Sequence, residues 1–354
     1  MKITGFNYSP YIIKLKKAFQ SSQQLITERR GFLISITDEL GNSAIGEAAP
    51  LPGLSLETLS DDEIILNILK SYINDIKFGD DFKSTDIILA NFHSSPSIRF
   101  GFEQAIIGLL IKRKDNFIEN DFGLPKSEIN INAVIGFGEL EDILTSIDDK
   151  IKSGYKTVKL KIGRDNFEDD YSIVAAVRDK FGNGIKLRLD ANSKWNTGNI
   201  LSYLKRLEGF NIEFIEEPGG DLLSLFDLAN DSPISIGIDE SLRSPDNAFT
   251  VIEESKIDTI ILKPGIFGGF LRTIKLIQLS NELNKKVIIS SSFESAIGKS
   301  GLVMLASLTN HELAHGLSTA EYFEANICND AFPVKNGIIS FDRAKYPPEF
   351  SISI

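Results

Sequence analysis

Three acidic residues, Asp190, Glu216 and Asp239, each lie at the end of a short apolar run. The intervals between them are 26 residues (190 to 216) and 23 residues (216 to 239), the length of one strand–helix repeat of a parallel barrel. The C-terminal strand ends of such a barrel meet at one site, so the three carboxylates should converge there. Converging carboxylates repel one another unless a cation binds them, and oxygen ligands favour a hard divalent ion. The sequence therefore predicts a Mg²⁺ site, with Mn²⁺ as the alternative ion.

Lysines are spaced so that they face the same site. Lys159 and Lys161 are two residues apart in the run 157–163, so in a strand their side chains share one face. Lys263 ends another apolar run, directly before Pro264. Buried lysines are costly without acidic neighbours, which places them beside the carboxylates. We therefore expect lysines of the second and sixth strands on opposite sides of the metal.

This arrangement suits the removal of a proton next to a carboxylate. A small carboxylate substrate would bind the metal between the lysines, the metal would stabilise the enediolate, and one lysine would act as base. Because Lys159, Lys161 and the metal carry like charges, the pKa of the base should be depressed. A single carboxylate at a strand end would be weak support for such a site, because it could be a helix N-cap. The prediction depends on the three carboxylates in order, together with the flanking lysines.

Further polar residues lie next to these groups. Arg188 and Asn192 share a strand face with Asp190. Arg188 is expected either to form a structural ion pair with an acidic neighbour or to reach the substrate carboxylate. Glu217 and Glu240 each follow a predicted ligand by one position, so strand alternation turns them to the other face. We expect these two to hydrogen-bond a lysine rather than to bind the metal, with Asn192 also supporting the site.

The elements that must position these groups form a repeating pattern. From about residue 130, eight β-like runs alternate with amphipathic stretches, at intervals of about 21–29 residues. The runs are 130–137, 157–163, 186–192, 212–218, 234–240, 259–265, 286–293 and 313–319. This α/β pattern predicts a TIM-type barrel rather than a doubly wound sheet, because no GxGxxG follows the first strand.

The N-terminal part has a different pattern. Two candidate strands, 31–39 and 43–51, flank the turn residues Leu40, Gly41 and Asn42, and helical runs follow at 61–76 and 99–113. We predict an α+β domain over 1–125 and the barrel over 126–320. A C-terminal segment over 321–354, with the short run 337–341, is expected to pack back on the first domain.

Composition excludes several classes of protein. The chain has 354 residues, of which 42% are hydrophobic and 25% charged, as in soluble globular proteins. The net charge of −11 argues against partners such as nucleic acid or an anionic membrane. No run approaches the ~20 apolar residues of a membrane span, and the N-terminus lacks the apolar core of a secretory signal. These features predict a cytoplasmic protein and are compatible with a homo-oligomer.

The cysteine and the histidines suggest no chemistry. Cys328 is the single cysteine, which excludes an internal disulfide and a thiolate metal cluster. No base-bearing motif surrounds it, so we expect a packed or surface thiol. His93, His311 and His315 have no paired-acid or HxxxH context and are expected to be surface or packing residues. Trp195 follows the third strand and is expected to cover the barrel rim.

The order of the motifs resembles the muconate-lactonizing subgroup of the enolase superfamily. The matching motifs are KxK at 159–161, DxN at 190–192, EEP at 216–218, DES at 239–241 and KPG at 263–265. The resemblance implies a modified (β/α)₇β barrel, an N-terminal capping domain completed by the C-terminal tail, and a bound Mg²⁺. It also implies abstraction of a proton next to a carboxylate, with the cap loop around 17–30 shaping the pocket.

Within this subgroup, several segments look like the o-succinylbenzoate synthase family, the dehydratases of menaquinone biosynthesis. The segments are GEAAPLPGLSLETL (46–59), LRLDAN (187–192), SSSFESAIG (290–298) and GLST (316–319). The resemblance implies a carbon–oxygen lyase in which Lys161 removes the proton and then protonates the departing hydroxyl in a syn elimination. Lys159 would lie beside it, and the charge of Lys263 would stabilise the enediolate. Arg188, Ser291 and Ser292 are then the expected substrate contacts.

Other functions fit parts of the same pattern. A dipeptide epimerase or N-acylamino acid racemase of the subgroup would use Lys161 and Lys263 on the two faces of the substrate. Dipeptide epimerases usually carry an acidic DxD-like motif near the last strand, and GLSTAEYF (316–323) has no such pair. A catalytically silent barrel that acts as a binding protein is disfavoured, because every predicted ligand and lysine is present.

Overall fold

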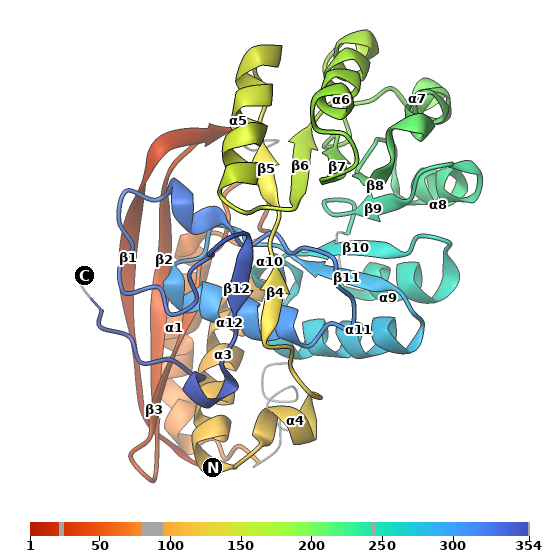
Figure 1. Ribbon diagram of the computed structural model, residues 1–354. Coiled ribbons are helices and arrows are strands. Elements are labelled where there is room, and N and C mark those ends of the chain that lie inside the picture. Colours follow the sequence, from red (N-terminus) through yellow and green to blue (C-terminus); the bar gives the residue numbers. More distant parts are fainter. Residues whose placement is uncertain (21–24, 80–94, 243–244, 353–354) are drawn as a thin grey trace.

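The computed structural model describes residues 1–20, 25–79, 95–242 and 245–352. A curled parallel sheet, with helices outside it, lies next to an antiparallel sheet that has helices of its own (Figure 1). No helix in these four ranges is long and apolar enough to cross a membrane. His93 and part of the cap loop around 17–30 lie outside the described residues.

The cap contains a three-stranded antiparallel sheet in the order β1-β2-β3. Its elements are β1 (Ile3–Gln20), β2 (Leu25–Asp38), β3 (Ser43–Ala48), α1 (Leu59–Tyr72), the 3₁₀ turn η1 (Ile73–Asp75), α3 (Pro96–Arg113) and α4 (Phe117–Asp121). The sequence did not predict β1, although it pairs with β2 from Ile3, opposite Asp38, to Gln20, opposite Leu25. Only over residues 11–15 does β1 alternate clearly between buried and exposed side chains, because it is the edge strand of the sheet.

The predicted turn between β2 and β3 is confirmed. Asp38 accepts hydrogen bonds from the backbone N–H groups of Leu40 (2.9 Å) and Asn42 (2.8 Å), and Gly41 has a φ of 82°. An Asp side chain that bonds the backbone two and four residues on closes the turn, and glycine adopts this φ without strain. Local chemistry therefore fixes the hairpin, and the register of β2 against β3 follows from it.

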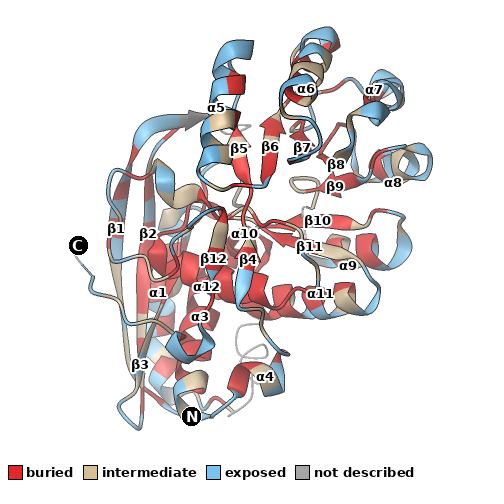
Figure 2. Ribbon diagram, viewed as in Figure 1, coloured by how far each residue is buried: buried red, intermediate tan, exposed pale blue. Residues whose placement is uncertain are grey.

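The helices of the cap begin where the sequence provides a cap. Thr58 and Asp61 form a capping box at the start of α1, each side chain bonding the backbone N–H of the other. Ser95 caps α3, which has Pro96 in its first turn. Nearly all of α3 is buried, because it packs against both the cap sheet and the barrel helices (Figure 2).

Seven parallel strands form the barrel sheet, in chain order from β5 to β11. The strands are β5 (Ala133–Ile135), β6 (Thr157–Lys161), β7 (Lys186–Asp190), β8 (Ile212–Glu216), β9 (Ile236–Ile238), β10 (Thr259–Leu262) and β11 (Lys286–Ile289). The helices are α5 (Leu140–Lys152), α6 (Phe167–Phe181), α7 (Ile200–Leu207), α8 (Leu222–Asp231), α9 (Pro245–Glu254), α10 (Pro264–Phe267), α11 (Phe270–Glu282) and α12 (Ala296–Ser307). Short 3₁₀ segments are η3 (Thr197–Asn199), η4 (Glu208–Phe210), η5 (Thr319–Tyr322) and η6 (Arg343–Lys345). The predicted α/β barrel with an N-terminal cap is confirmed.

The eighth barrel strand is reduced to two bridge residues. His315 pairs in parallel with Ile131, and Gly316 pairs in parallel with Ser290, so the sheet closes between β5 and β11. The run 313–319 was predicted as a full strand; its backbone bonds extend over these two positions only. This closure gives the (β/α)₇β arrangement.

The C-terminal segment contacts both parts of the molecule. Its strand β12 (Ile338–Ser340) pairs with β4 (Glu128–Asn130), at the start of the barrel, and the two lie side by side in Figure 1. The run 337–341 was expected to contact the first domain, so its pairing with β4 differs from that expectation. Elsewhere the segment does touch the cap, since Phe323 bridges to Leu15.

Buried hydrogen bonds join the cap to the barrel. Glu47 on β3 accepts from the backbone N–H groups of Ser295 (2.9 Å) and Gly298 (2.8 Å), at the start of α12. Gln104 on α3 donates to Ile297 O at 2.7 Å. Arg29 on β2 donates to Ser292 O at 3.1 Å. Acidic groups are favourable at a helix N-terminus, so these contacts hold α12 in a fixed position against the cap.

Candidate active site

A cavity of about 890 Å³ opens at the C-terminal ends of the barrel strands. Most of the residues predicted from the sequence line it, among them Lys159, Lys161, Arg188, Asp190, Asn192, Glu216, Asp239, Lys263 and Ser291. Glu240 lines it as well, and the cap closes one side through Ile26, Leu51 and Leu54. The cap and the barrel therefore form this cavity together.

The register of the sheet explains why the charged side chains meet. Lys161 on β6 is opposite Asp190 on β7, which is opposite Glu216 on β8. Glu216 pairs in turn with Gly237, two residues before Asp239. These side chains therefore lie in one row across the barrel mouth, as the matched strand-end positions predicted.

Three carboxylates converge in this row. Glu216, Asp239 and Glu240 each offer an oxygen, and these oxygens lie within 4.8 Å of one another. Burial, reinforced by Asp190, raises the pKa of Glu216 to about 8. Burial beside Asp239 raises the pKa of Glu240 to about 7. Such shifts mark like charges held together in a poorly solvated place.

Two lysines of β6 lie against these acids. Lys159 Nζ is 2.9 Å from Asp190 and 3.0 Å from Glu216, so it joins the two carboxylates. Lys161 Nζ donates to Asp190 Oδ2 at 2.7 Å and to Asn192 Oδ1 at 2.5 Å. The shared strand face of Lys159 and Lys161 therefore brings both amines to the acidic row, at different positions in it.

The acids also set the protonation of the lysines. Burial lowers the pKa of Lys159, but Asp190 and Glu216 raise it more, so it lies well above its usual value. Burial also lowers the pKa of Lys263, but nearby acids raise it more, above all Asp239, to which Lys263 donates a hydrogen bond, so this pKa is raised as well. These two pKa values are raised because the nearest charged neighbours of Lys159 and Lys263 are carboxylates.

Within the described ranges, neither Glu217 nor Glu240 has a hydrogen bond or an ion pair to a lysine, contrary to the prediction. Glu217 has a φ of 44°, which ends the strand alternation on which the prediction relied. Its carboxylate instead accepts from the backbone N–H groups of Asp239 and Ser241, both at 2.8 Å, and so holds the loop after β9. Glu240 accepts from Asn192 Nδ2 at 2.9 Å and joins the acidic cluster.

Arg188 forms an ion pair with an acidic neighbour, as one of the two expectations had it, and the partner is Glu213 rather than Asp190 or Glu216. Its Nε donates to Glu213 Oε2 at 2.6 Å and its Nη1 to Ala314 O at 2.6 Å, while the guanidinium lies 4.8 Å from the ring centroid of Phe214. Asp190 shares its strand face but points to the lysines instead. Arg188 thus ties β7 to β8 and to the closing segment of the barrel.

The two predicted serines differ in position. Ser291 lines the cavity, and its hydroxyl lies 2.7 Å from that of Thr319. Ser292 does not line the cavity: its side chain is buried, and its Oγ has no hydrogen-bond partner among the described residues. The expected substrate contact is therefore not available to Ser292, because Phe293 adopts a φ of 63° and the chain turns away from the strand direction.

Aromatic residues that the sequence analysis did not select complete the wall. Phe137, Phe293 and Tyr322 line the cavity, and the rings of Phe293 and Tyr322 meet edge to face with centroids 5.7 Å apart. Phe137 follows β5 directly, so its strand-end position could have identified it. Tyr322 lies in η5, and no local pattern places it here.

The histidines support the barrel wall. His315 accepts from Ile289 N–H at 2.9 Å through Nδ1, and His311 Nε2 lies 2.9 Å from Val287 O. Burial lowers the pKa of His311 to about 4 and holds that of His315 well below its usual value. Both rings are thus neutral packing groups, as predicted, and they replace backbone bonds that a longer eighth strand would make.

The cysteine and the tryptophan also have structural environments. Burial raises the pKa of Cys328 to about 12, so the thiol stays protonated at neutral pH. Trp195 is buried and donates from Nε1 to Asp170 at 3.2 Å. Asp170 also accepts from the N–H of Gly163 at 2.8 Å, so Trp195 helps to hold the loop after β6.

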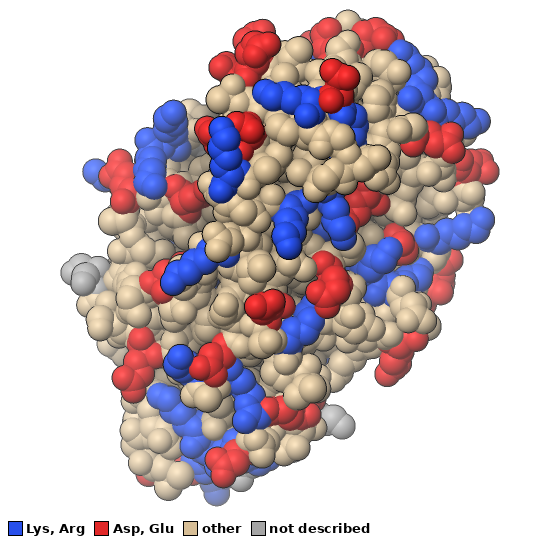
Figure 3. All heavy atoms as spheres, in the orientation of Figure 1, with Lys and Arg blue, Asp and Glu red and all other residues tan. Residues whose placement is uncertain are grey.

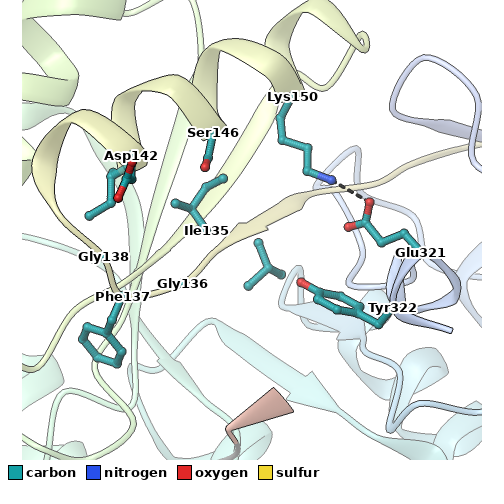
Figure 4. A pocket seen from close by; sticks show the side chains of 11 residues that line it. Ile135, Gly136, Phe137, Gly138, Asp142, Ser146, Lys150, Glu321 and Tyr322 are labelled. Carbon is teal, nitrogen blue, oxygen red and sulfur yellow. Dashed lines mark hydrogen bonds and ion pairs between the residues drawn. The ribbon is translucent and has the colours of Figure 1, made fainter. Parts of the chain in front are cut away.

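A second pocket of about 350 Å³ adjoins the main cavity. It lies between the end of β5, α5 and η5, and Glu321 and Tyr322 line both pockets (Figure 4). An ion pair of 2.6 Å between Lys150 and Glu321 crosses its rim. On the face of the molecule in Figure 3, acidic and basic side chains are interspersed, without a large patch of one sign.

Both parts of the chain match models of known protein families. Residues 142–345 match the model described as "Enolase C-terminal domain-like". The chain belongs to this family. Residues 7–109 match the model "MenC, N-terminal domain", so the cap and the barrel both belong to the enolase superfamily. Members of the superfamily are enzymes, and so is this chain.

Proteins of two different activities are among the relatives of this enolase-superfamily chain. An o-succinylbenzoate synthase of Bacillus subtilis (strain 168), which is a lyase, is 27% identical over 97% of this chain and 91% of the relative. An L-Ala-D/L-Glu epimerase of Francisella tularensis subsp. novicida is 24% identical over 90% of this chain and 89% of the relative. The crystal structure of a dipeptide epimerase from Enterococcus faecalis, complexed with Mg and a dipeptide, is similar with a TM-score of 0.84. That structure is 22% identical and is matched over 97% of this chain and 98% of its own.

Proposed function

We propose that this enzyme is an o-succinylbenzoate synthase. It would dehydrate 2-succinyl-6-hydroxy-2,4-cyclohexadiene-1-carboxylate to o-succinylbenzoate, a step of menaquinone biosynthesis. The observation that carries the proposal is the position of Lys161, the last residue of β6, and Lys263, the residue that follows β10, because β6 and β10 flank the acidic row of β7–β9. The match of the cap to the MenC N-terminal model supports this choice within the superfamily.

The acidic row fits a divalent cation. Its donors are carboxylate oxygens, and the convergence of buried Glu216 with the partly buried Asp239 and Glu240 favours a bound positive charge. We propose that Asp190, Glu216 and Asp239 hold Mg²⁺, or Mn²⁺ in its place, with Glu240 beside them. The bound ion would stabilise the negative charge that develops on the substrate carboxylate. The dipeptide epimerase of similar fold that was crystallised with Mg supports this assignment.

Lys161 is the proposed acid and base. Its hydrogen bonds to Asp190 and Asn192 hold the amine on one side of the cavity, next to one face of the substrate. In the proposed reaction its neutral amine takes the proton next to the carboxylate, and the electron pair forms the enediolate. The ammonium then returns the proton to the departing hydroxyl, which leaves as water from the same face. One residue suffices for both transfers, as a syn elimination requires.

Lys159 and Lys263 are proposed to act through their charge. Their raised pKa values keep both protonated at neutral pH. Lys263, on the opposite side of the acidic row from Lys161, would stabilise the enediolate from the second face. Lys159, held between Asp190 and Glu216, would neutralise part of the acidic charge and fix both side chains.

Direct assay tests the proposal. The purified enzyme with Mg²⁺ should convert the cyclohexadiene precursor, and aromatisation is followed by ultraviolet absorbance. Lys161→Ala should lose this activity, whereas Lys152→Ala, at an exposed lysine of α5, should retain it. No aromatisation with either Mg²⁺ or Mn²⁺ would refute the proposed activity.

A second activity has specific support. The epimerase relatives share the fold, and opposed lysines at the ends of β6 and β10 suit proton transfer on both faces of a substrate. An epimerase or N-acylamino acid racemase would exchange the α-proton of a dipeptide or an N-succinylamino acid in D₂O. Rapid exchange with inversion, without aromatisation of the precursor, would favour this candidate and leave the lysine and metal proposals in place.

A further inference from the structure

The turn after β11 holds a strained residue against the cavity. Phe293 has a φ of 63°, in the left-handed region that residues other than glycine rarely adopt. Glu294 stabilises this turn, because its Oε2 accepts from Ser291 Oγ at 2.6 Å and from Ser292 N at 2.7 Å. Backbone strain of this kind persists only where surrounding contacts fix it, and it concentrates at functional sites.

A packing role does not account for the carboxylate of Glu294. The residue is 3% exposed, and its Oε1 has no hydrogen-bond partner among the described residues. A buried carboxyl oxygen without a partner is costly, and an apolar side chain of similar size would fill the space without that cost. What Glu294 contributes is therefore its hydrogen bonds, and one of these goes to a hydroxyl in the cavity wall.

These bonds fix the direction of a short chain of hydroxyls. Ser291 has one hydroxyl hydrogen, which it donates to Glu294. Its oxygen accepts from Phe293 N–H at 3.1 Å and lies 2.7 Å from Thr319 Oγ1. Because the hydrogen of Ser291 is used on Glu294, Thr319 must be the donor in the Ser291–Thr319 bond. The lone pairs of Thr319 Oγ1 then remain available, and Thr319 lines the cavity.

We propose that Glu294 is a positioning residue that, through Ser291, makes Thr319 Oγ1 an acceptor for a hydrogen-bond donor on the bound carboxylate substrate. The inference rests on the proposed function for the identity of that substrate. For the cyclohexadiene precursor, the donor is the ring hydroxyl that leaves during the reaction. For an epimerase substrate, the donor is an amide N–H or an ammonium group. The product of the dehydration lacks the ring hydroxyl, and an ester analogue of an epimerase substrate lacks the amide N–H, so each serves as a ligand without the donor.

Thr319→Val tests the acceptor with little change in shape. Loss of one such hydrogen bond should raise the KM for the precursor by about 3–10-fold. The inhibition constant of o-succinylbenzoate, which has no ring hydroxyl, should stay within about twofold of wild type. Thr319→Ser restores the hydroxyl and should restore the KM. A general packing defect would weaken substrate and product alike, and that outcome would overturn the proposal.

Glu294 is tested by two replacements. Glu294→Gln keeps an acceptor oxygen for Ser291 and should leave the KM near that of wild type. Glu294→Leu removes the acceptor, frees the Ser291 hydroxyl and should raise the KM as Thr319→Val does, again without weakening the product. Ser292→Ala is the matched control, because the Ser292 hydroxyl does not line the cavity and has no hydrogen-bond partner in the part of the chain that the structure describes. An unchanged KM in Glu294→Leu would contradict the positioning role.

The donor test also works without turnover. Calorimetry compares an N-succinylamino acid with its ester counterpart, in which oxygen replaces the amide N–H. Thr319→Val should weaken binding of the amide by about 3–10-fold and leave the affinity for the ester unchanged. Equal effects on the two affinities would overturn the proposal that Thr319 accepts a hydrogen bond from the ligand. Aromatisation of the precursor by wild-type enzyme tests the proposed function separately. The proposed function and the acceptor role of Thr319 can therefore fail independently of each other.

Discussion

A buried carboxyl group in the cap makes the stability of the protein depend on pH. Asp62 of α1 is 0% exposed and accepts hydrogen bonds from the hydroxyls of Ser95 (2.6 Å) and Ser97 (2.7 Å). Burial raises its pKa to about 7, although the two hydroxyls act in the opposite direction. The folded state therefore binds the proton of Asp62 more tightly than the unfolded state, where the pKa is about 3.9. The stabilisation from this proton is complete below about pH 4 and is lost as the pH rises through 7.

The linkage relation gives the size of the effect. With a folded pKa of about 7 and an unfolded pKa of about 3.9, Asp62 contributes about 2.5 kcal/mol more stability at pH 5 than at pH 8. Asp62→Asn keeps the shape and the partners but cannot titrate. The free energy of unfolding of this variant, minus that of wild type, should therefore rise by about 2.5 kcal/mol between pH 5 and pH 8.

Urea denaturation at the two pH values measures this difference. Because each comparison is made at a single pH, the titration of every other group cancels in it. Glu63→Gln is the matched control, at the next residue of α1 but on the exposed face; its difference from wild type should be the same at both pH values. If the free energy of unfolding of Asp62→Asn minus that of wild type is the same at pH 5 and pH 8, the reasoning is refuted.

Three further predictions concern the cap contact, the acidic row and the lysines. Glu47→Ala should lower the free energy of unfolding by about 3–5 kcal/mol in urea denaturation, because it leaves buried donors at the start of α12 unpaired; Glu47→Gln, which keeps one acceptor oxygen, should cost less. Glu216→Gln should abolish activity and the rise in Tm on adding Mg²⁺, while the Tm without Mg²⁺ does not fall at neutral pH, since burial raises the pKa of Glu216 to about 8 and the uncharged amide replaces a carboxyl that is largely protonated there; an unchanged response to Mg²⁺ would argue against Glu216 as a ligand. Lys263→Arg should retain appreciable dehydration because it keeps the charge, whereas Lys161→Arg should retain almost none, since arginine does not release a proton at neutral pH; equal losses in the two variants would remove the distinction between charge and proton transfer.

Strand ends were predictable because their signal is local. Asp190 and Glu216 close apolar runs one repeat apart, and in a parallel barrel this spacing is enough to bring them to one edge. The lysines of β6 share a face because side chains alternate along a strand, a property of the backbone itself. The predicted positions of these residues in the cavity wall therefore needed no knowledge of distant contacts.

Prediction failed where the backbone leaves the regular strand. Glu217 and Phe293 both have positive φ values, so alternation no longer gives the direction of the side chains around them. Glu217 bonds the loop after β9, and Ser292 turns out of the cavity. The prediction of a full eighth strand failed for a related reason. A side-chain hydrogen bond of His315 replaces part of the backbone hydrogen bonding between the strands, so the β-bridges of this segment extend over two residues only.

The sequence by itself determined the barrel, the acidic row and the lysines that face it, because strand period and repeat length are encoded in neighbouring residues. Only the tertiary structure decided that Glu240 joins the acids, that Arg188 pairs with Glu213, and that the hydroxyl of Thr319 meets that of Ser291. These contacts join different strands and loops, and the sequence gives no local signal for which residues will meet. Close packing and the cost of leaving buried polar groups unpaired select them once the chain has folded.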